Sequence, residues 1–495
     1  MKNVMVILCD QFRPDFISCY NENSPVKTPN IDNLYHDGLL CEHAVTASPV
    51  CAPGRASMMT GTYLSRHGVW TNDVPFNDGL DFLPMRMKEM NYACGAFGKL
   101  HHFPGKDSKG FDVAWQMEER RLGDEDDYLK YLKTLHPDET TVFPTDENGH
   151  FAYNYQEYYE HQIANRAMSF IEENKNSSPF FTWVSFQGPH GPMDSPIFDY
   201  TVDADAVPAP VNPEFNPPCQ VPRYRKSRGD VHTYEQNKAY RADYVKMIEF
   251  IDFEVGRITK YLKENNLYEN TVIIFSTDHG DLCGDYNMHQ KGPFLYAAQL
   301  EVPMIIANHD NLPKNTKTTM LTSNLDIGAT ILNVAGDYKD FAFSRDISAM
   351  YCQKFDKREE VYTEFADSMR LLSTKEYRFA YFPFSGECEL VKICNETENL
   401  ANKAEYQELK AKFLMKIIDY MIAAKGVNIE AQDLTPKVQQ GLSKIKPNYK
   451  DELTLVFPIA SKEQIDALER DGLDSTYNEF CKTRNVVKFY GKYWD

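Results

Sequence analysis

The chain has 495 residues and a mass of 57.1 kDa, with 42% hydrophobic residues, 25% charged residues and a mean hydropathy of −0.52. This composition is typical of globular proteins and excludes a disordered or collagen-like chain. The longest apolar runs, residues 4–9 and 272–275, are far shorter than the roughly 20 residues of a membrane-spanning helix. The net charge of −19 repels nucleic acid and anionic lipid, so we expect neither as a partner. A small anionic substrate would need a local cluster of cations.

The eleven cysteines are scattered, without a C-x-x-C pair or a zinc-like spacing. This pattern is typical of reduced thiols. Lys2 and Asn3 lead directly into the first apolar run, without a signal-peptide pattern. We therefore expect a cytoplasmic protein, or a secreted or periplasmic one if a leader has been removed.

Four short apolar runs are each followed by a polar residue that can take part in chemistry. The runs and these residues are 4–8 with Asp10, 93–97 with Lys99, 180–186 with His190, and 272–275 with Asp278. Continuous apolar strands are typical of a parallel sheet that is covered on both faces. Ligands bind at the carboxyl ends of such strands, so we expect the four polar residues to meet there.

Helical periodicity is predicted over residues 161–173 and 241–266, whereas six prolines between residues 203 and 230 predict a long loop. The charge run at 118–127 is expected to be a solvated loop. Beyond residue 348 the pattern changes to short, partly alternating runs and then a helix over 405–424. The short runs are residues 361–365, 370–373, 376–382 and 387–393. They predict an antiparallel meander.

The predicted fold class is therefore α/β, with a large, mostly parallel sheet sandwiched by helices. A smaller C-terminal α+β subdomain is built on an antiparallel sheet. We expect a catalytic domain over residues 1–348, the subdomain over 349–425 and an extension over 426–495. Aromatic residues near the end, including Tyr493 and Trp494, favour a homo-oligomer formed through this extension.

Residues 49–61 predict a short helix with a cysteine at its start. Pro53 and Gly61 bracket the helix and leave Cys51 at its N-terminus, where free N–H groups and the helix dipole stabilise an anion. Arg55 is four residues further on and therefore lies on the same face. These residues alone fit a buried cysteine beside a structural arginine equally well.

The flanking residues favour a catalytic role, because the segment strongly resembles the signature of the type I sulfatases of the alkaline phosphatase superfamily. That signature is C-x-P-x-R, a spacer, two apolar residues, Thr and Gly. The matching residues are Cys51, Pro53, Arg55, Met58, Met59, Thr60 and Gly61. Gly54 departs from the Ser, Thr or Ala that is usual at its position.

Further motifs resemble those of this family, in the same order along most of the chain. They are residues 3–11, T-P-N-I-D at 28–32, G-K-L-H at 98–101, P-H-G-P at 189–192, D-H-G-D at 278–281 and K-G-P at 291–293. The resemblance implies an alkaline-phosphatase-like fold and ends near residue 424.

The resemblance also implies a mechanism. A maturation enzyme would oxidise Cys51 to formylglycine, whose hydrate attacks sulfur and whose second hydroxyl later expels sulfate. The implied metal ligands are Asp10, Gln11, Asp278, His279 and the formylglycine at position 51. Two carboxylates and an amide oxygen suit Ca²⁺, while the histidine nitrogen leaves Mn²⁺ and Mg²⁺ as alternatives.

The remaining matched residues are implied to bind the substrate or to transfer protons. Arg55 would hold the formylglycine hydroxyl, and Lys99 and Lys291 would bind sulfate oxygens. Either His190 or His101 would be the general acid on the leaving oxygen. Asn72 and His190 would also line the sulfate pocket.

We therefore expect a sulfatase that hydrolyses a small sulfate monoester of a carbohydrate or another alcohol. The alternative is a phosphonate monoester or phosphodiester hydrolase of the same superfamily, favoured by Gln11, His279 and Asn72. Lys99 and His101 in K-x-H spacing favour sulfate. A catalytically silent glycan-binding relative is disfavoured, because every matched position holds a competent residue. Carbohydrate, choline-like alcohol and aryl groups are all compatible with the sequence as the leaving group.

Overall fold

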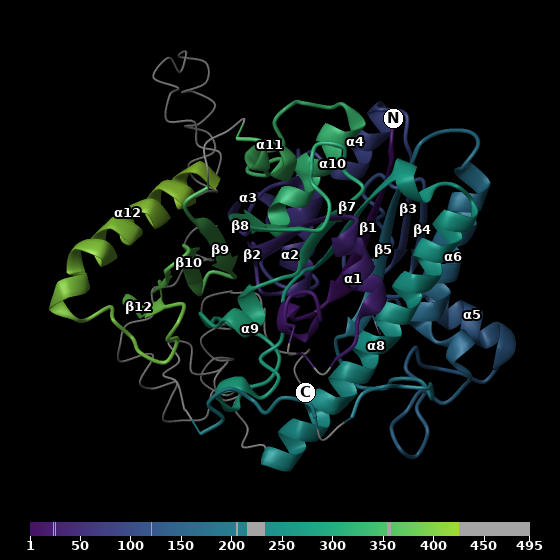
Figure 1. Cartoon of the computed structure of the whole chain (residues 1–495), viewed down its shortest axis with the longest axis horizontal. Helices are drawn as coiled ribbons and strands as arrows, with labels where there is room; N and C mark the ends of the chain where they lie inside the picture. Colours follow the sequence, from purple (N-terminus) through teal and green to yellow (C-terminus); the bar gives the residue numbers. More distant parts are fainter. Residues whose placement is uncertain are drawn as a thin grey trace, which may run out of the picture.

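The computed structural model describes residues 1–22, 24, 26–119, 121–203, 206–214, 233–353, 358–383 and 385–424. Its centre is a sheet of eight strands in the order β4-β3-β5-β1-β6-β7-β2-β8 (Figure 1). The strands are β1 Asn3–Asp10, β2 Gly38–Val45, β3 Ala93–Gly98, β4 Val113–Gln116, β5 Phe180–Pro189, β6 Thr271–Thr277, β7 Met304–Ala307 and β8 Thr316–Ser323. β7 pairs antiparallel with β6 and β2, and the other pairs are parallel. The prediction of a mostly parallel sheet is confirmed.

The continuous apolar sequence of β1 is explained by burial on both of its faces. Successive side chains of a strand point to opposite faces. Met5, Ile7 and Cys9 accordingly belong to one core cluster, while Val4 and Leu8 belong to another. Every residue of β1 is buried. A strand that alternates between two apolar cores shows no polar alternation in its sequence.

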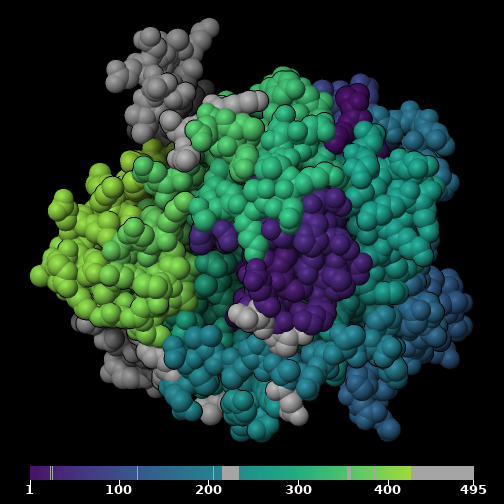
Figure 2. Space-filling view, viewed as in Figure 1, coloured from purple at the N-terminus to yellow at the C-terminus, as the bar shows by residue number. Residues whose placement is uncertain are grey.

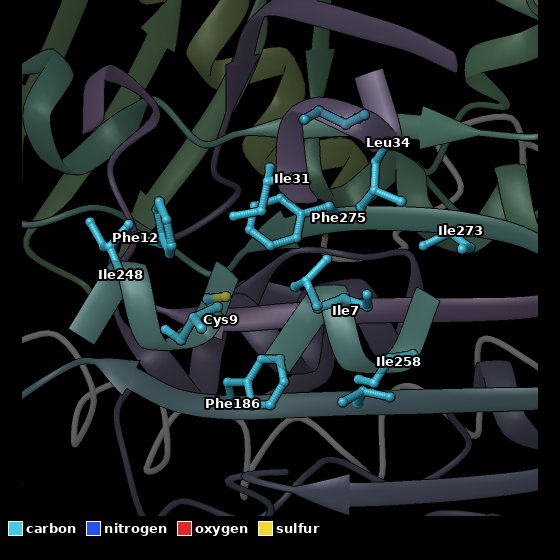
Figure 3. Packing of buried hydrophobic residues seen from close by; sticks show 14 of the residues in the cluster. Ile7, Cys9, Phe12, Ile31, Leu34, Phe186, Ile248, Ile258, Ile273 and Phe275 are labelled. Atoms are coloured by element: carbon cyan, nitrogen blue, oxygen red, sulfur yellow. The ribbon is translucent and has the colours of Figure 1, made fainter. Parts of the chain in front are cut away.

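Helices cover both faces of the sheet. The first core holds apolar side chains of three helices. Figure 3 shows part of this cluster, with Ile31 of α1 and Ile248 of α8 beside residues of the strands. These helices are α1 Pro29–His36, α6 Tyr159–Asn174 and α8 Tyr234–Glu264. The second core holds side chains of α2 Cys51–Thr60, α4 Leu83–Glu89, α10 Ile327–Ala335 and α11 Ile347–Tyr351. The three-layer arrangement places α2 against the sheet with its first residue near the carboxyl ends of the strands.

The helix predicted over 241–266 begins earlier, at Tyr234. Thr233 forms a capping box: its hydroxyl accepts the N–H of Gln236 at 3.2 Å, and its own N–H donates to the Gln236 side chain at 2.8 Å. The first residues of α8 are exposed and polar, so they carry no apolar periodicity. Of the predicted 203–230 loop, residues 203 and 206–214 contain no helix or strand, and the rest lies outside the described residues.

A second sheet follows as the predicted antiparallel meander, in the order β12-β11-β10-β9. Its strands are β9 Val361–Phe365, β10 Met369–Ser373, β11 Tyr377–Phe382 and β12 Glu387–Lys392. α12 (Gln407–Ala424) covers one face, where Leu372 and Phe379 contact the cluster that holds Phe413. On the other face, Leu371 and Ala380 share a core cluster with residues of β2 and β8.

The second sheet therefore shares a core with the main body, and Figure 2 shows the two lying directly against each other. The boundary at residues 348 and 349 stays a prediction. The extension over 426–495 and its role in oligomer formation lie outside the described residues.

The shorter helices are α3 Leu64–His67, α5 Asp127–Leu135 and α9 Ala297–Leu300. Among the described residues, no helix has both the length and the apolar character to span a bilayer.

Candidate active site

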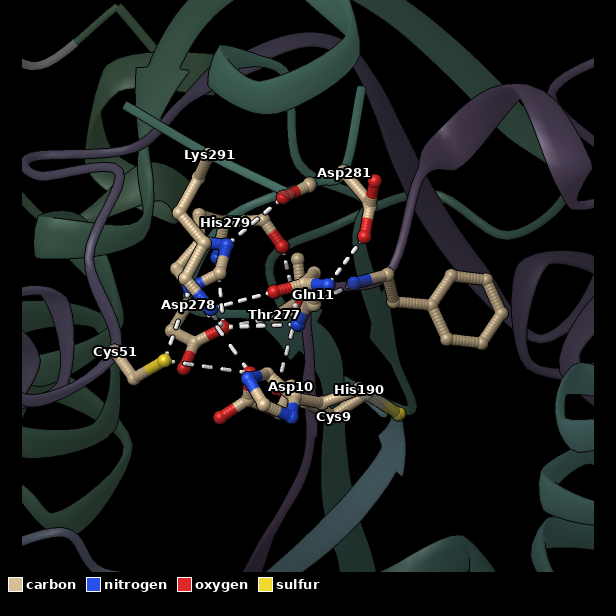
Figure 4. A network of polar contacts seen from close by, with 12 residues as sticks. Cys9, Asp10, Gln11, Cys51, His190, Thr277, Asp278, His279, Asp281 and Lys291 are labelled. Carbon is tan, nitrogen blue, oxygen red and sulfur yellow. Dashed lines mark hydrogen bonds and ion pairs between the residues drawn. The ribbon is translucent and has the colours of Figure 1, made fainter. Parts of the chain in front are cut away.

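The four strands that were predicted to end in chemical groups are neighbours in the sheet, in the order β3-β5-β1-β6. β1 ends at Asp10, and β6 ends at Thr277, next to Asp278. Lys99 follows β3, and His190 follows β5. Because the four strands are parallel, these side chains gather at one edge, as predicted. Figure 4 shows Asp10, His190 and Asp278 at this edge.

Four of the five predicted metal ligands form one compact cluster. A side-chain ligand atom from each of Asp10, Cys51, Asp278 and His279 lies within 4.8 Å of the other three, and all four residues are buried. The Cys51 thiol is 3.5 Å from Asp10 Oδ1 and 3.2 Å from His279 Nε2. Burial lowers the pKa of His279, which favours the neutral imidazole that a metal ion requires. Two carboxylates and a neutral imidazole therefore fit a divalent cation.

Gln11, the fifth predicted ligand, lies beside this cluster with its side chain engaged by two other residues. Its Oε1 accepts a hydrogen bond from Lys291 Nζ at 2.5 Å, and its Nε2 donates to Asp281. Its backbone N–H donates to Asp278 Oδ1 at 3.1 Å. Its φ of 68° lies in the left-handed region, where the chain turns sharply after β1. Gln11 thus connects Lys291 to the cluster, and its role as a ligand stays a prediction.

Cys51 is the first residue of α2, and Gly61 ends the helix with a φ of 65°, as the bracketing residues predicted. Gly54 allows this helix to approach the site closely. A Cβ atom at position 54 would lie 3.0 Å from the carbonyl oxygen of Ser48 and 3.4 Å from that of Asp278. Position 54 thus departs from the usual Ser, Thr or Ala at a point where α2 packs tightly against the backbone of Ser48 and Asp278.

Arg55 joins the two carboxylates of the cluster. Its Nε donates to Asp278 Oδ2 at 2.8 Å, and its Nη2 donates to Asp10 Oδ2 at 3.1 Å. Its Nη1 donates to Ser185 Oγ at 2.7 Å and to the carbonyl oxygen of Lys99 at 2.5 Å. Burial disfavours the charged guanidinium, but Asp278 and Asp10 outweigh burial and raise the pKa of Arg55. A permanently charged arginine thus fixes both carboxylates.

Lys99 is fully buried between two carboxylates. Its Nζ is 2.8 Å from Asp10 Oδ2 and 2.5 Å from Glu119 Oε1. Burial opposes its charge, but these two carboxylates raise its pKa above the usual value. Burial likewise opposes the ionisation of Asp10, yet Lys99, His190 and Arg55 hold the pKa of Asp10 well below its usual range.

The two candidate general acids have different surroundings. His101 is 3% exposed, and within the described part of the chain neither of its ring nitrogens has a hydrogen-bond partner. Burial, Arg121 and Lys99 lower its pKa well below the usual value, so its ring is neutral. The His190 side chain is 22% exposed, and its Nδ1 donates to the carbonyl oxygen of Gly191 at 2.7 Å. That contact leaves Nε2 of His190 for a substrate.

Asn72 is held at the start of α2, beside Cys51. Its Oδ1 accepts the backbone N–H of Ala52 at 3.2 Å. This contact satisfies one of the free N–H groups at the helix N-terminus. The structure therefore places Asn72 beside Cys51, and its role in lining a sulfate pocket stays a prediction.

The expectation of a solvated loop over 118–127 holds for residues 123–125, which are exposed, but is wrong for Glu118 and Asp126, which are buried. Glu118 is 1% exposed, and its carboxylate accepts the backbone N–H groups of Leu100 at 2.7 Å and His101 at 2.8 Å. Burial raises the pKa of Glu118 to about 7. Glu119 contacts Lys99, and Asp126 caps α5 through the N–H groups of its first turn. A charge run carries no sequence signal for burial, because the partners of Glu118 and Glu119 come from the segment after β3.

Comparison of the sequence with known proteins identifies the family to which this chain belongs. Residues 2–337 match the family model described as Sulfatase, and the chain belongs to this family. It is 27% identical to an arylsulfatase of Clostridium perfringens over 84% of this chain and 93% of that protein. It is 25% identical to a choline-sulfatase of Rhizobium meliloti over 68% of this chain and 67% of that protein.

Solved structures share the fold. The phosphonate monoester hydrolase of Agrobacterium radiobacter superposes with a TM-score of 0.72 at 22% identity, covering 86% of this chain and 96% of that one. A putative sulfatase from Bacteroides fragilis gives a TM-score of 0.67 at 22% identity, over 86% and 96% of the two chains. The fold is that of the alkaline phosphatase superfamily, and the protein is a sulfuric ester hydrolase.

Proposed function

We propose that this sulfatase hydrolyses a small sulfate monoester with a formylglycine made from Cys51. The observation that carries the proposal is the position of Cys51. It stands at the N-terminus of α2, within 4.8 Å of two carboxylates and an imidazole, and Arg55 holds both carboxylates. Once formed, the formylglycine hydrate would supply an oxygen nucleophile in place of the thiol. Cys51 is 1% exposed, so we expect the maturation enzyme to act before the chain folds.

Peptide mass spectrometry over Cys51 tests this modification directly. On protein made together with a formylglycine-generating enzyme, we expect a peptide that carries an aldehyde in place of the thiol. Cys94, a second fully buried cysteine, should keep its thiol in the same digest. An intact Cys51 under these conditions would contradict the proposed nucleophile.

We propose that Asp10, Gln11, Asp278 and His279 hold one divalent ion together with the modified residue 51. The donor set favours Ca²⁺, with Mn²⁺ and Mg²⁺ as alternatives. When bound, this ion would offset the carboxylate charges and stabilise negative charge on the ester oxygens. Asp10 and Asp278 are both fully buried, and Arg55 bonds both.

Removal of the ion should therefore lower the stability of the protein. At a metal concentration 100 times the Kd, binding contributes about 2.7 kcal/mol. We expect the Tm to fall on dialysis against a chelator and to recover with added metal. A matched control is Asp252→Asn, which alters a buried carboxylate that bonds Asn30 and Ile31 in α1 and should preserve the metal response. Asp278→Asn should abolish that response, and a normal response in this variant would exclude the assigned metal site.

The remaining residues act on the ester. Lys99 and Lys291 would bind its anionic oxygens, and Asn72 would line the pocket beside Cys51. His190 would protonate the leaving oxygen. The choice of His190 over His101 is supported by exposure, because the general acid must reach the leaving oxygen and His101 is buried with a neutral ring. The partly exposed ring of His190 can meet a leaving group that enters from solvent.

The substrate class is tested by comparing esters with the same leaving group. The similarity to an arylsulfatase and to a choline-sulfatase supports a sulfate monoester of a small alcohol or carbohydrate. The Asp, Gln, Asp and His metal set supports the alternative, a phosphonate monoester or phosphodiester hydrolase. We expect kcat/KM for p-nitrophenyl sulfate to exceed that for bis-p-nitrophenyl phosphate. A phosphodiester preference of about 10²-fold or more would reverse the ranking of the two functions.

A further inference from the structure

Five charged side chains form an alternating row along one side of the site. Asp10 contacts Lys99, whose Nζ is also 2.5 Å from Glu119 Oε1. Glu119 Oε2 accepts from Arg121 Nη1 at 2.6 Å, and Arg121 Nε is 3.2 Å from Asp73 Oδ1. Three carboxylates thus alternate with two cations. The row therefore has a net negative charge, and it includes Lys99, which is proposed to bind the ester oxygens.

Glu119 lies at the middle of this row and touches several groups of the site. Besides Lys99 and Arg121, it accepts a hydrogen bond from Gln187 Nε2 at 3.0 Å and lies 4.0 Å from His190 Nδ1. Its backbone has a φ of 58°, in the left-handed region. These contacts come from the segments after β3 and β4, from β5 itself and from the residue that follows it, so the tertiary fold places this carboxylate next to the lysine that is proposed to bind sulfate.

The charge of Glu119 acts in surroundings that screen it weakly. Its side chain is 17% exposed, and Lys99 is fully buried. Burial opposes the ionisation of Glu119, but Lys99, Arg121 and His190 hold its pKa well below the usual range. A negative charge that is fixed beside a buried cation strongly reduces the attraction that this cation exerts on a second anion.

We propose that Glu119 determines specificity by limiting the positive charge of Lys99, so that the site selects singly charged ester groups over doubly charged ones. This inference rests on the proposed function, in which Lys99 binds the anionic oxygens of the ester. A sulfate monoester carries one negative charge. A phosphate monoester carries two above its second pKa of about 6. The second charge would be repelled by Glu119 and, more weakly, by Asp73.

The experiment compares p-nitrophenyl sulfate with p-nitrophenyl phosphate at pH 8, where the second ester is a dianion. Glu119→Gln keeps an oxygen that can accept from Lys99 and Gln187 but removes the charge. We expect the ratio of kcat/KM for sulfate to that for phosphate to fall at least about tenfold, mainly through a lower KM for phosphate. Inorganic phosphate should inhibit this variant more strongly than the parent.

Three further variants separate charge from position. Glu119→Asp keeps the negative charge on a side chain that is one methylene shorter. It should preserve the ratio even if kcat falls. Asp73→Asn removes a charge three ion pairs away from Lys99 and should shift the ratio in the same direction by a smaller factor. Glu125→Gln, an exposed carboxylate in the same part of the chain, should leave the ratio unchanged.

An unchanged ratio in Glu119→Gln would overturn the inference, as would a ratio that falls equally in Glu119→Asp. If Glu119→Gln does not fold, an unchanged ratio in Asp73→Asn would overturn it instead. Failure of the proposed function looks different, because sulfate hydrolysis would then persist in Cys51→Ala. Loss of activity in Cys51→Ala together with an unchanged Glu119→Gln ratio would refute the role of Glu119 alone.

Discussion

Replacement of Cys51 by alanine is expected to lower kcat/KM for a chromogenic sulfate ester by about 10⁴-fold or more. Removing a catalytic nucleophile commonly causes a loss of this size or larger. Alanine cannot be converted to an aldehyde, whereas the neighbouring Asp10, Asp278 and His279 would all remain. The measurement is steady-state turnover of p-nitrophenyl sulfate by parent and variant, both made with the maturation enzyme.

The matched control is Cys94→Ala, which removes a fully buried thiol from β3 without touching the cluster. This variant should keep the parent kcat/KM. The metal-dependent rise in Tm should persist in Cys51→Ala, because two carboxylates and an imidazole still surround the ion. Residual activity above about 1% of the parent in Cys51→Ala would show that another group supplies the nucleophile.

Replacement of Arg55 by alanine is expected to affect stability and catalysis together. It leaves the fully buried carboxylates of Asp10 and Asp278 without the cation that joins them. Removing one partner of a buried ion pair typically destabilises a protein by about 3–5 kcal/mol. Loss of a preorganised charged donor at the site should also lower kcat by about 10²–10³-fold.

Denaturant unfolding of Arg55→Ala, with and without divalent metal, measures the first effect. A bound cation offsets part of the carboxylate repulsion, so the destabilisation should be larger in chelator than in metal. The matched control is Arg86→Ala. Arg86 is also buried and also contacts two carboxylates, Asp81 and Asp337, but it lies outside the cluster. Its loss should destabilise the protein equally in metal and in chelator and should leave kcat unchanged. A metal-independent loss of stability in Arg55→Ala would contradict the assigned metal site.

Local sequence patterns were sufficient to predict the fold class, the four strands that lead to the site and the antiparallel meander, but not the strands β2, β4, β7 and β8. The apolar runs of β1, β3, β5 and β6 predicted buried parallel strands, because a strand covered on both faces needs apolar residues at every position. Short, partly alternating runs separated by turn-like breaks predicted the meander of β9 to β12. The start of α8 was missed, because its exposed first residues carry no periodicity.

The order and spacing of the residues were enough to predict which residues could take part in the chemistry and which strand ends would bring many of them together. Cys51 and Arg55 share a helix face through their spacing, Asp10 ends β1, and Asp278 follows the adjacent parallel strand β6. Which charges are buried against each other became evident from the folded chain. Glu118, Glu119 and Arg121 form a plain charge run in the sequence, yet Lys99, Leu100 and Asp73 make them part of the site. The physical reason is that burial and ion pairing depend on partners from distant segments, which a local pattern does not contain.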